Sequence, residues 1–251
     1  MTALSGKTAI ITGAAHGIGR AIAERFFADG AKLMLADLNE QGLREVAASL
    51  GGETIIEPGD LSREATANHL VATALEKFGR VDILVNNAGG GVIRPFLEHT
   101  PETLRQTIDR NLWTCLWCCR AVLPHMVQQK SGRIVNIGAD SVRNGLWAHA
   151  AYNAAKGGMH GLTTGLAREF ALDKITVNTV APCMVATPEV DRLMQSGHEL
   201  SPLAEKFLSV IPMGRPGEMS EVASAVAYLA SDEAAFITGQ VISVNGGSTM
   251  L

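Results

Sequence analysis

Short apolar runs rich in β-branched residues alternate along the chain with longer stretches in which apolar residues recur every three or four positions. The runs predict strands at 7–12, 31–37, 53–57, 81–85, 132–138, 174–180 and 240–245. The stretches predict helices at 17–29, 40–50, 62–78, 101–129, 151–172 and 219–231. Several strands are apolar almost throughout, as strands covered on both faces must be. The alternation therefore predicts one α/β domain over residues 1–251, a doubly wound seven-stranded parallel sheet with helices on both faces.

A few residues mark where the predicted helices begin and end. Thr100 precedes Pro101, which is the usual order of an N-cap and a first helical position. Ser62 and Ser220 are further N-cap candidates. Pro124 lies inside the longest predicted helix and should kink or end it, because proline lacks the backbone donor and clashes with the preceding turn.

The stretch 183–218 is irregular and interrupts the alternation near the end of the chain. In a doubly wound sheet such a segment lies beyond the carboxyl ends of the strands, where ligands bind. We interpret it as a substrate lid, and a partly disordered surface loop is the alternative.

Composition restricts the classes of protein that fit this chain. Apolar residues make up 47% and charged residues 18%, which favours a large buried core over disorder. The net charge of -4, without a basic block, argues against a nucleic-acid partner. The N-terminus lacks the pattern of a signal peptide, and no apolar run reaches the roughly 18 residues of a membrane span. We therefore expect a cytoplasmic protein with no membrane partner.

The cysteines raise the question of metal or redox chemistry, since Cys115 and Cys118 form a C-x-x-C pair. No second pair with ligand spacing exists, and the pair falls inside a predicted helix rather than at a strand-to-helix turn. We predict that these two, Cys119 and Cys183 are buried packing thiols and that the chain holds no metal.

A glycine-rich turn follows the first predicted strand and precedes a predicted helix. It reads Thr-Gly-Ala-Ala-His-Gly-Ile-Gly over residues 12–19. Glycine lets a backbone approach a pyrophosphate without Cβ clashes, and the helix N-terminus offers free N–H groups and the positive end of the helix dipole. The predicted dinucleotide contacts in this turn are Gly13, Ala15, His16, Gly17, Ile18 and Gly19.

A downstream acid completes the pattern of a dinucleotide site. Asp37 ends the second predicted strand, and Leu38 follows it. A carboxylate at this place accepts hydrogen bonds from the adenosine ribose hydroxyls and repels a 2′-phosphate. We therefore predict NAD rather than NADP as the cofactor, with Asp37 and Leu38 in its site. His16 carries too little charge at neutral pH to reverse this preference.

The pattern T-G-x-x-x-G-I-G resembles the short-chain dehydrogenase/reductase family, and other motifs extend the resemblance over nearly the whole chain. These are Asn86-Asn87-Ala88-Gly89, Asn111, Tyr152-Asn153-Ala154-Ala155-Lys156, and Pro182 with Thr187. The resemblance implies a Rossmann fold and interconversion of a secondary alcohol and a ketone. It also implies cofactor contacts at the adenine (Asp60, Leu61), the central channel (Asn87, Ala88, Gly89) and the nicotinamide carboxamide (Pro182, Val185, Thr187). The family's usual glycine after that proline is Cys183 here, which is strained if the position needs a positive φ.

Tyr152 and Lys156 are four residues apart, which places both on one face of a helix. A phenol titrates near pH 10, and a nearby ammonium favours the phenolate and lowers that pKa. Tyr152 can then take a hydroxyl proton as hydride leaves the carbinol carbon, or return it in the reverse direction. The family resemblance assigns this role to Tyr152, has Lys156 also bind the nicotinamide ribose, and has Asn111 anchor a water that relays protons to Lys156.

One position departs from the family pattern. The family places a serine thirteen residues before the tyrosine, where its hydroxyl holds the substrate oxygen, and that position is Ala139 here. If the backbone stays extended, Ser141 points the same way, since strand side chains alternate with period two. Its Cα would then lie roughly 6–7 Å further along the strand. Three outcomes are open: Ser141 takes the place of the missing serine hydroxyl, a water takes its place, or activity is reduced. A further interpretation is that Ala139 is an engineered replacement.

The remaining candidates concern the pocket and assembly. Asn144, Trp147 and His149 precede Tyr152 in a loop, and with Ala139, Ser141 and Met184 they are the predicted substrate contacts. A surface role is the alternative for the three loop residues. Trp113 and Trp117 share one helix face, which is either core or a subunit interface. Members of the family that the chain resembles commonly dimerise through this helix, so we favour an interface, and a homotetramer that also uses the apolar C-terminal segment 240–251.

The substrate class stays open at the level of sequence. The segments 132–137 and 236–244 resemble β-ketoacyl-thioester reductases and hydroxycyclohexanecarboxyl-CoA dehydrogenases. Asp37 favours a catabolic, oxidative direction, and Leu146, Trp147, Met184 and Phe207 suggest an apolar or cyclic small molecule, including a hydroxyacyl-CoA. The alternative to an enzyme is an NAD(H)-binding regulator or scaffold in which Ala139 has impaired catalysis.

Overall fold

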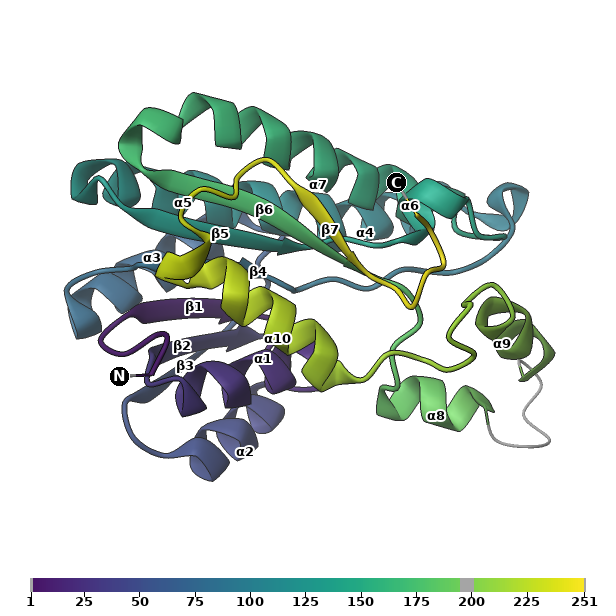
Figure 1. Ribbon diagram of the computed structural model, residues 1–251, viewed down its shortest axis with the longest axis horizontal. Helices are drawn as coiled ribbons and strands as arrows, with labels where there is room; N and C mark the ends of the chain where they lie inside the picture. Colours follow the sequence, from purple (N-terminus) through teal and green to yellow (C-terminus); the bar gives the residue numbers. More distant parts are fainter. Residues whose placement is uncertain (1, 195–200, 251) are drawn as a thin grey trace.

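The computed structural model, which describes residues 2–194 and 201–250, contains one parallel sheet in the order β3-β2-β1-β4-β5-β6-β7 (Figure 1). The strands are β1 (Thr8–Thr12), β2 (Lys32–Asp37), β3 (Thr54–Pro58), β4 (Ile83–Asn86), β5 (Gly132–Ile137), β6 (Ile175–Pro182) and β7 (Val241–Val244). The order reverses between β1 and β4, so the first βα turn and the end of β4 lie side by side at the carboxyl edge. The predicted doubly wound Rossmann fold is confirmed.

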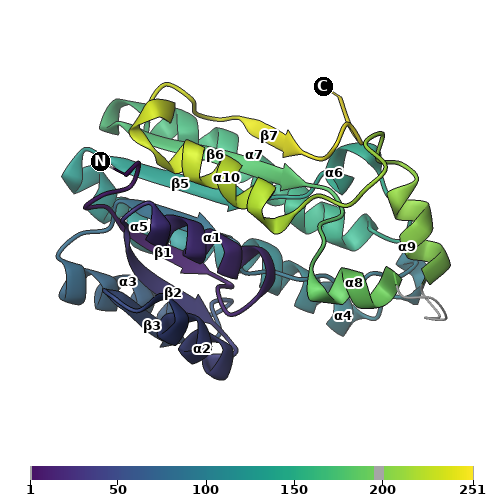
Figure 2. The ribbon, with the colours of Figure 1, turned by 60° about the horizontal axis from the view of Figure 1, so that its bottom comes forward.

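Helices cover both faces of the sheet. They are α1 (Gly17–Ala28), α2 (Glu40–Leu50), α3 (Glu64–Phe78), α4 (Pro101–Ile108), α5 (Thr114–Gln129), α6 (Ser141–Asn144), α7 (Ala150–Glu169), α8 (Pro188–Met194), α9 (Ser201–Leu208) and α10 (Met219–Ala230). Short 3-10 turns lie at Phe96–Glu98, Ala171–Asp173 and Asp232–Ala234. One core joins the sheet to α1, α2 and α10, and the other joins it to α3, α5 and α7 (Figure 2). Consecutive residues of β1 divide between them, Ile11 in the first core and Ile10 in the second.

The helix boundaries confirm some sequence predictions and overturn others. Thr100 caps α4, where its hydroxyl accepts from the Thr103 N–H. Ser62 is not a cap: Arg63 precedes α3, and the Ser62 hydroxyl donates to Asp60. Ser220 lies inside α10, which a capping box on Glu218 begins. The boundary residue lies one position away from Ser62 and two from Ser220, and of the two boundary residues Glu218 caps its helix with its side chain and Arg63 does not.

The longest predicted helix is interrupted, but not where proline predicts. The backbone widens into a π-helical turn, η2, at Asp109–Trp113, between α4 and α5. Helix α5 then continues past Pro124 to Gln129, so of the two outcomes predicted for this proline, a kink or an end, the end does not occur. A π turn holds one extra residue per turn and is common at functional sites.

Buried hydrogen bonds fix α7 onto the sheet. The Asn136 amide on β5 donates to the Thr163 hydroxyl on α7 at 2.9 Å, and Thr163 meets the Thr179 hydroxyl on β6 at 2.7 Å. On the other side, the Asn86 amide on β4 donates to Asn136 at 2.9 Å. Because buried polar groups are costly to leave unpaired, this chain of bonds holds α7 in one register above β4, β5 and β6.

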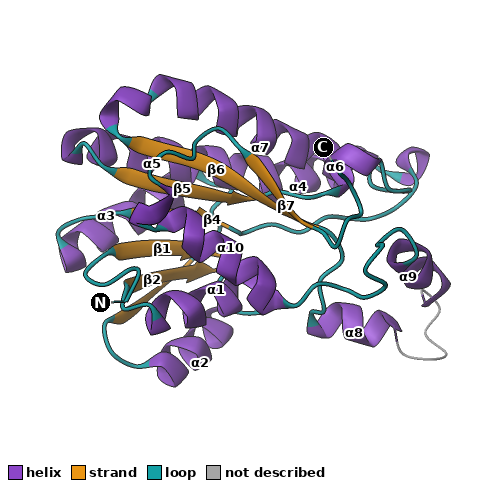
Figure 3. Ribbon diagram, in the orientation of Figure 1, coloured by secondary structure: helices purple, strands orange, loops and turns teal. Residues whose placement is uncertain are grey.

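The segment predicted as a lid lies beyond the carboxyl ends of the strands, where α8 and α9 stand apart from the sheet (Figures 1 and 3). Its two ends are joined, because Ala186 and Gly217 form a backbone hydrogen bond of 2.8 Å and the Gly217 N–H donates to the Met184 carbonyl. Residues 195–200 of this segment lie outside the described part of the chain. Within residues 2–194 and 201–250, no helix combines the length and apolar character that crossing a membrane requires.

Candidate active site

The glycine-rich turn packs so closely that side chains are excluded at two positions. A Cβ on Gly13 would lie 2.8 Å from the Asn87 amide nitrogen, and one on Gly19 would lie 1.9 Å from the Gly13 carbonyl oxygen. Gly13 and Gly17 also have φ of 66° and 56°, in the left-handed region that favours glycine. The turn therefore depends on these glycines for its geometry, not only for flexibility.

Thr12 joins this turn to the segment that follows β4. Its buried hydroxyl accepts from the N–H groups of Asn87 and Ala88 at 3.0 and 2.9 Å and lies 3.3 Å from the Val85 carbonyl, to which it donates. The Asn87 amide donates back to the carbonyls of Thr12 and Gly13. The two stretches that the sequence assigns to the cofactor are thus held as one surface.

The N-terminus of α1 and the end of β2 lie where the sequence predicts the adenosine side of the site. His16 is the N-cap of α1, in an extended conformation and with no side-chain cap, so no side chain covers the first N–H groups of the helix. The Asp37 carboxylate accepts from the Ala15 N–H at 3.0 Å and from the Asn39 N–H at 2.9 Å. These bonds fix a partly exposed carboxylate beside the turn, while Leu38 next to it is 67% exposed.

Asp60 and Leu61 follow β3 on the same edge. Leu61 is buried, and the Asp60 carboxylate accepts from the hydroxyl and the N–H of Ser62 at 2.7 and 3.0 Å. These hydrogen bonds hold the pKa of Asp60 below its usual value. The carboxylate is fixed near the position where the resemblance expects an adenine.

The predicted nicotinamide residues lie across the glycine turn. Pro182 ends β6, and Val185 is buried. The Thr187 methyl lies 3.9 Å from a Cβ built on Gly17, which brings the end of β6 against the start of α1. Cys183 does not have a positive φ, so the strain considered for a non-glycine residue there is absent. The glycine-rich turn 12–19, Asp37, the segment 60–61 and the residues 182–187 together form a cradle. This cradle fits an extended dinucleotide running from Asp37 to Thr187.

Three consecutive glycines after β4 form a floor under the predicted catalytic residues. A Cβ on Gly89 would lie 2.6 Å from Asn111 Oδ1 and 3.4 Å from Lys156 Nζ, and one on Gly91 would lie 2.6 Å from the Tyr152 ring. Asn111, Tyr152 and Lys156 are thus brought together on one patch of backbone, as the sequence predicts. Gly91 was not singled out, although its place in the run Gly89-Gly90-Gly91 is a visible sign of close approach.

Asn111 lies in the π turn and is fully buried. Its amide donates to the carbonyls of Gly90 and Thr107 at 2.9 and 2.8 Å, and its oxygen accepts from the Gly90 N–H at 3.2 Å. The side chain therefore fixes the glycine floor to the helix. Both amide hydrogens are already bonded, so any further partner has to be a donor to Oδ1.

Burial controls the protonation of Tyr152 and Lys156. Burial raises the pKa of the Tyr152 phenol to about 12 and lowers the pKa of Lys156 to about 8. Lys156 Nζ lies 5.8 Å from the centre of the Tyr152 ring and donates to the Ile137 carbonyl at 2.7 Å. We expected the nearby ammonium to lower the pKa of Tyr152, but burial acts in the opposite direction and raises it. This site holds a protonated phenol.

The vacant serine position is clear in the structure. Ala139 is buried at the end of β5, and Asp140 takes helical angles (φ -65°, ψ -29°), so α6 begins at Ser141 and the chain is not extended there. The Ser141 hydroxyl turns to Asn153 and donates to its side-chain oxygen at 2.6 Å. The geometric condition under which Ser141 would replace the missing hydroxyl is therefore not met.

Asp140 is a buried residue that sequence reasoning missed. Its carboxylate accepts from Asn245, Ser248 and Thr249 at 2.7–3.0 Å and from Asn144 at 3.2 Å, with no cation among these partners. These bonds hold the C-terminal segment against α6, close to which the chain ends in Figure 1. They also engage the Asn144 amide, which donates to Ser248 as well, so the structure gives this predicted substrate contact a structural role.

The remaining predicted substrate contacts, His149, Trp147 and Met184, have different surroundings. The His149 ring meets Tyr152 at 6.0 Å between ring centres and Phe207 of α9 at 5.2 Å. The Trp147 side chain is 54% exposed, and its carbonyl faces the His149 ring. Met184 is partly buried, and its backbone carbonyl accepts from the Gly217 N–H, where the two ends of the segment 183–218 meet. His149 thus contacts Tyr152, and Phe207 in turn contacts His149.

All four cysteines were predicted to be buried packing thiols, and three of them are buried. Cys115, Cys118 and Cys119 are buried, and burial and the neighbouring thiols raise the pKa values of Cys115 and Cys118. Cys183 is only partly buried, and burial raises its pKa to about 11. No cluster of three or more His, Cys, Asp or Glu side chains suited to a metal ion occurs within the ranges 2–194 and 201–250.

A dinucleotide cradle and a Tyr-Lys pair on one sheet edge define a nicotinamide-dependent oxidoreductase of the Rossmann type. The chain belongs to the short-chain dehydrogenase/reductase family: the family model described as enoyl-(acyl carrier protein) reductase matches residues 13–249. The resemblance drawn from the sequence motifs is confirmed.

Two curated relatives and one solved structure refine this assignment. The chain is 62% identical over 252 aligned positions to the 2,3-dihydroxy-2,3-dihydro-p-cumate dehydrogenase of Pseudomonas putida, covering 99% of this chain and 96% of the relative. It is 37% identical to the 1,6-dihydroxycyclohexa-2,4-diene-1-carboxylate dehydrogenase of Acinetobacter baylyi, covering 96% and 95%. The crystal structure of a short-chain dehydrogenase/reductase, glucose/ribitol dehydrogenase, from Brucella melitensis superposes with a TM-score of 0.90 at 36% identity, covering 100% and 99%.

Proposed function

We propose that this chain is a cytoplasmic, NAD-dependent dehydrogenase that oxidises one hydroxyl of a cyclic vicinal dihydrodiol carrying a carboxylate. The observation that carries the proposal is the Tyr152–Lys156 pair above the glycine floor, in a chain 62% identical to a dehydrogenase whose name specifies such a diol. The narrower substrate fits the apolar, cyclic class that the sequence suggested and replaces the hydroxyacyl-CoA in our interpretation.

Asp37 supports NAD as the cofactor. Its carboxylate is fixed beside the turn by the Ala15 and Asn39 N–H groups, at the place where a ribose hydroxyl donates and a 2′-phosphate would be repelled. Gly13, Gly17 and the N-terminus of α1 would hold the pyrophosphate, and Thr187 the carboxamide. When bound, NAD+ supplies the acceptor for the hydride.

The chain's own residues take up the proton of the substrate hydroxyl. Tyr152 accepts the hydroxyl proton of the carbinol as its carbon is oxidised. That transfer needs a pKa below the value of about 12 that burial imposes. The positive charge of Lys156 and of an oxidised nicotinamide both act in that direction. Lys156 holds its place through the Ile137 carbonyl, and Asn111 holds the floor.

The chemistry of a dihydrodiol sets the direction. Removing two hydrogens from a ring with two double bonds and two adjacent hydroxyls gives a hydroxydienone, whose tautomer is an aromatic catechol. The balance is dihydrodiol plus NAD+ to catechol plus NADH plus H+. Aromatisation makes the reverse reaction unfavourable, in keeping with the oxidative role that Asp37 suggested.

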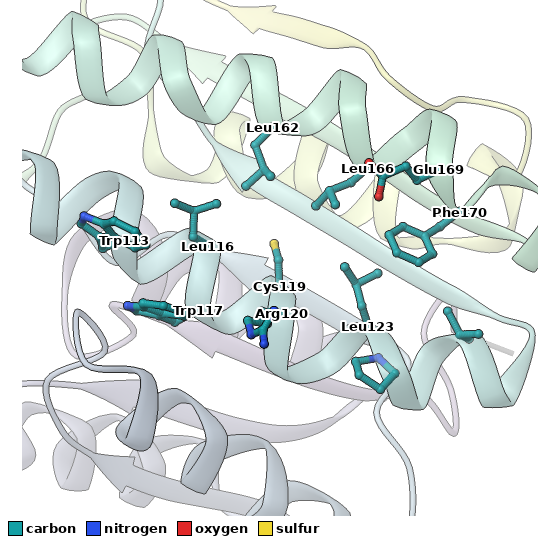
Figure 4. Close-up of a pocket in the computed structure, with 12 residues that line it drawn as sticks. Trp113, Leu116, Trp117, Cys119, Arg120, Leu123, Leu162, Leu166, Glu169 and Phe170 are labelled. Atoms are coloured by element: carbon teal, nitrogen blue, oxygen red, sulfur yellow. The ribbon is translucent and has the colours of Figure 1, made fainter.

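Assembly as a homotetramer is part of the proposal. An apolar groove of about 480 Å³ runs between α5 and α7, where Leu162, Leu166 and Phe170 face Leu116 and Leu123 (Figure 4). Trp113 and Trp117 stack at one end, with ring centres 5.0 Å apart. An exposed apolar groove of this kind supports the proposal that a second copy of the chain covers it. The sheet edge at β7 supports a second contact, beside the fully exposed Phe236. A monomeric mass in light scattering at micromolar concentration would contradict this.

Turnover separates this proposal from the alternative of an NAD(H)-binding regulator. We expect the protein to reduce NAD+ when given a ring carboxylate dihydrodiol, with catechol appearing in equal amounts. A regulator would bind NADH, detected by its fluorescence, and would oxidise no member of a panel of cyclic diols and secondary alcohols. Tight NADH binding with no turnover of any of them would overturn the proposed function.

A further inference from the structure

His149 occupies the wall of the mouth next to the catalytic tyrosine. It is the N-cap residue of α7, one helical turn before Tyr152, so both side chains rise from the same part of the helix. Its ring meets Tyr152 edge-on at 6.0 Å and Phe207 of the lid at 5.2 Å, with interplanar angles of 76° and 77°. The imidazole is thus held between the catalytic phenol and the lid.

The hydrogen bonding of His149 fixes which ring nitrogen is available. Nδ1 lies 2.8 Å from the Trp147 carbonyl, which can only accept, so Nδ1 carries a hydrogen. Burial lowers the pKa of His149, which favours the neutral ring. In the neutral ring the other nitrogen, Nε2, presents a lone pair. No hydrogen bond to Nε2 is found among the residues that the structure describes.

The backbone before His149 is held in an uncommon conformation. Ala148 has φ of 63°, the left-handed region that residues with a Cβ seldom adopt. Its carbonyl accepts from the Arg94 N–H at 3.3 Å, which joins this loop to the segment after the glycine floor. Strain of this kind persists where the surrounding structure requires it, and it is concentrated at functional sites.

The polar groups that follow β5 are already buried, engaged or absent. Ala139 offers no hydroxyl, Ser141 donates to Asn153, and the Asp140 carboxylate is occupied by four donors. A substrate with two adjacent hydroxyls needs one partner besides Tyr152 for the hydroxyl that is not oxidised. His149 Nε2 is the acceptor next to Tyr152 that these contacts leave available.

We propose that His149 Nε2 accepts a hydrogen bond from the second hydroxyl of a vicinal diol while Tyr152 takes the proton of the first. This inference rests on the proposed function and names the group that distinguishes a diol from a simple alcohol. His149 is then a specificity-determining residue, and a substrate lacking the neighbouring hydroxyl leaves its nitrogen unpaired.

The test compares two substrates in three proteins. The substrates are cis-1,2-dihydroxycyclohexa-3,5-diene and cyclohex-2-en-1-ol, which lacks the second hydroxyl. The variant His149→Phe keeps a flat ring but removes the acceptor, and His149→Gln restores an acceptor oxygen. We expect His149→Phe to lower kcat/KM for the diol about tenfold, as for loss of one hydrogen bond, and to leave the mono-alcohol within about twofold. We expect His149→Gln to recover part of the diol preference.

A matched control uses the same substitution at another histidine. His69→Phe on α3, where the side chain is 67% exposed, should change neither substrate. NADH binding, followed by fluorescence, should stay unchanged in all variants, because His149 lies outside the cradle. Equal losses on both substrates, or no loss on the diol, would overturn the inference while leaving the dehydrogenase in place. No turnover of any dihydrodiol by the unmodified protein would overturn the proposed function itself.

Discussion

The two ends of the carboxyl edge of the sheet are built in different ways. At the nucleotide end, the surface of the turn consists mainly of backbone. Gly13 and Gly19 leave no room for a side chain, and the Thr12 hydroxyl binds the N–H groups of the segment after β4. At the substrate end, the surface consists of side chains from β5, α7 and the lid, and one expected side chain is replaced by Ala139. A backbone site requires particular residues and so leaves a motif, whereas a side-chain site can be built in many ways.

The difference also concerns how the groups are fixed. Asp37 and Asn87 bond to main-chain N–H and carbonyl groups, which any sequence with the same fold provides. At the substrate end, Ser141 and Asp140 bond to side chains, those of Asn153 and Thr249, whereas His149 bonds to the main-chain carbonyl of Trp147. One substitution at the substrate end therefore changes several contacts, and specificity can change there while the cofactor end stays constant.

The largest effect expected at the substrate end is loss of the proton acceptor. Tyr152→Phe keeps the ring on the glycine floor but removes the ionisable oxygen, and should lower kcat by about 10²–10⁴, the usual contribution of general acid–base catalysis. NADH affinity should stay nearly normal in fluorescence titrations. Lys156→Ala, by contrast, should damage both turnover and cofactor binding. A near-normal kcat in Tyr152→Phe would mean that another residue is the base.

The next largest effect concerns the vacant serine position. Ala139→Ser supplies a donor to the substrate oxygen and should raise kcat by up to about 10²–10³, the usual value of one transition-state donor. Ser141→Ala should change kcat little, because that hydroxyl is bonded to Asn153. Steady-state kinetics of both variants decide between these roles. A severe loss in Ser141→Ala, in a folded protein that binds NADH, would contradict the geometry described above.

The protonation of Tyr152 can be measured directly, because the chain has only two tyrosines. In Tyr228→Phe, Tyr152 alone contributes phenolate absorbance. Burial raises its pKa to about 12, so at pH 10 it should stay protonated, where free tyrosine is about half ionised. Saturating NAD+ at the same pH should increase the phenolate absorbance. Half-ionisation at pH 10 without cofactor would show that the ammonium of Lys156 is sufficient alone.

The smallest of these effects tests the nucleotide end. NAD should bind at least tenfold more tightly than NADP, about 1.4 kcal/mol, because Asp37 repels a 2′-phosphate. Replacing Asp37 with Ser and Leu38 with Arg should narrow or invert that preference. Calorimetric titration of both cofactors provides the measurement. Equal affinities of the unmodified protein would refute the role given to Asp37 and leave the substrate end unaffected.

The fold and the cofactor end could be predicted closely from the sequence. All seven strands appear within two residues of their predicted bounds, since apolar runs between turn signals fix them. The substrate end could be predicted only in part. The sequence pointed to Tyr152 and Lys156 through their spacing, but nothing in the alternation of residues showed that Asp140 turns helical, so Ser141 was considered as a replacement. Tertiary hydrogen bonds to the distant C-terminal segment decide that turn.

Two further misses have similar causes. The helices α8 and α9 fall in the stretch that was interpreted as irregular, because short helices give weak periodicity. The tyrosine pKa was expected to fall because an ammonium lies four residues away, but burial of both groups is a property of the folded state and reverses the direction. Residue types and spacing do not report solvent exposure.

The π turn at Asp109–Trp113 sets the rotational phase of one long helical path. Each residue of an α-helix advances the side-chain direction by about 100°, so one additional residue in a turn offsets everything after it by roughly that angle. Within the turn, the Asn111 amide donates to the Gly90 carbonyl of the glycine floor, and Trp113 lines the outer groove, where it stacks on Trp117 of α5. A single-residue deletion here should therefore rotate the side chains of α5 by roughly 100° relative to α4, and should lose both catalysis and the subunit association proposed above.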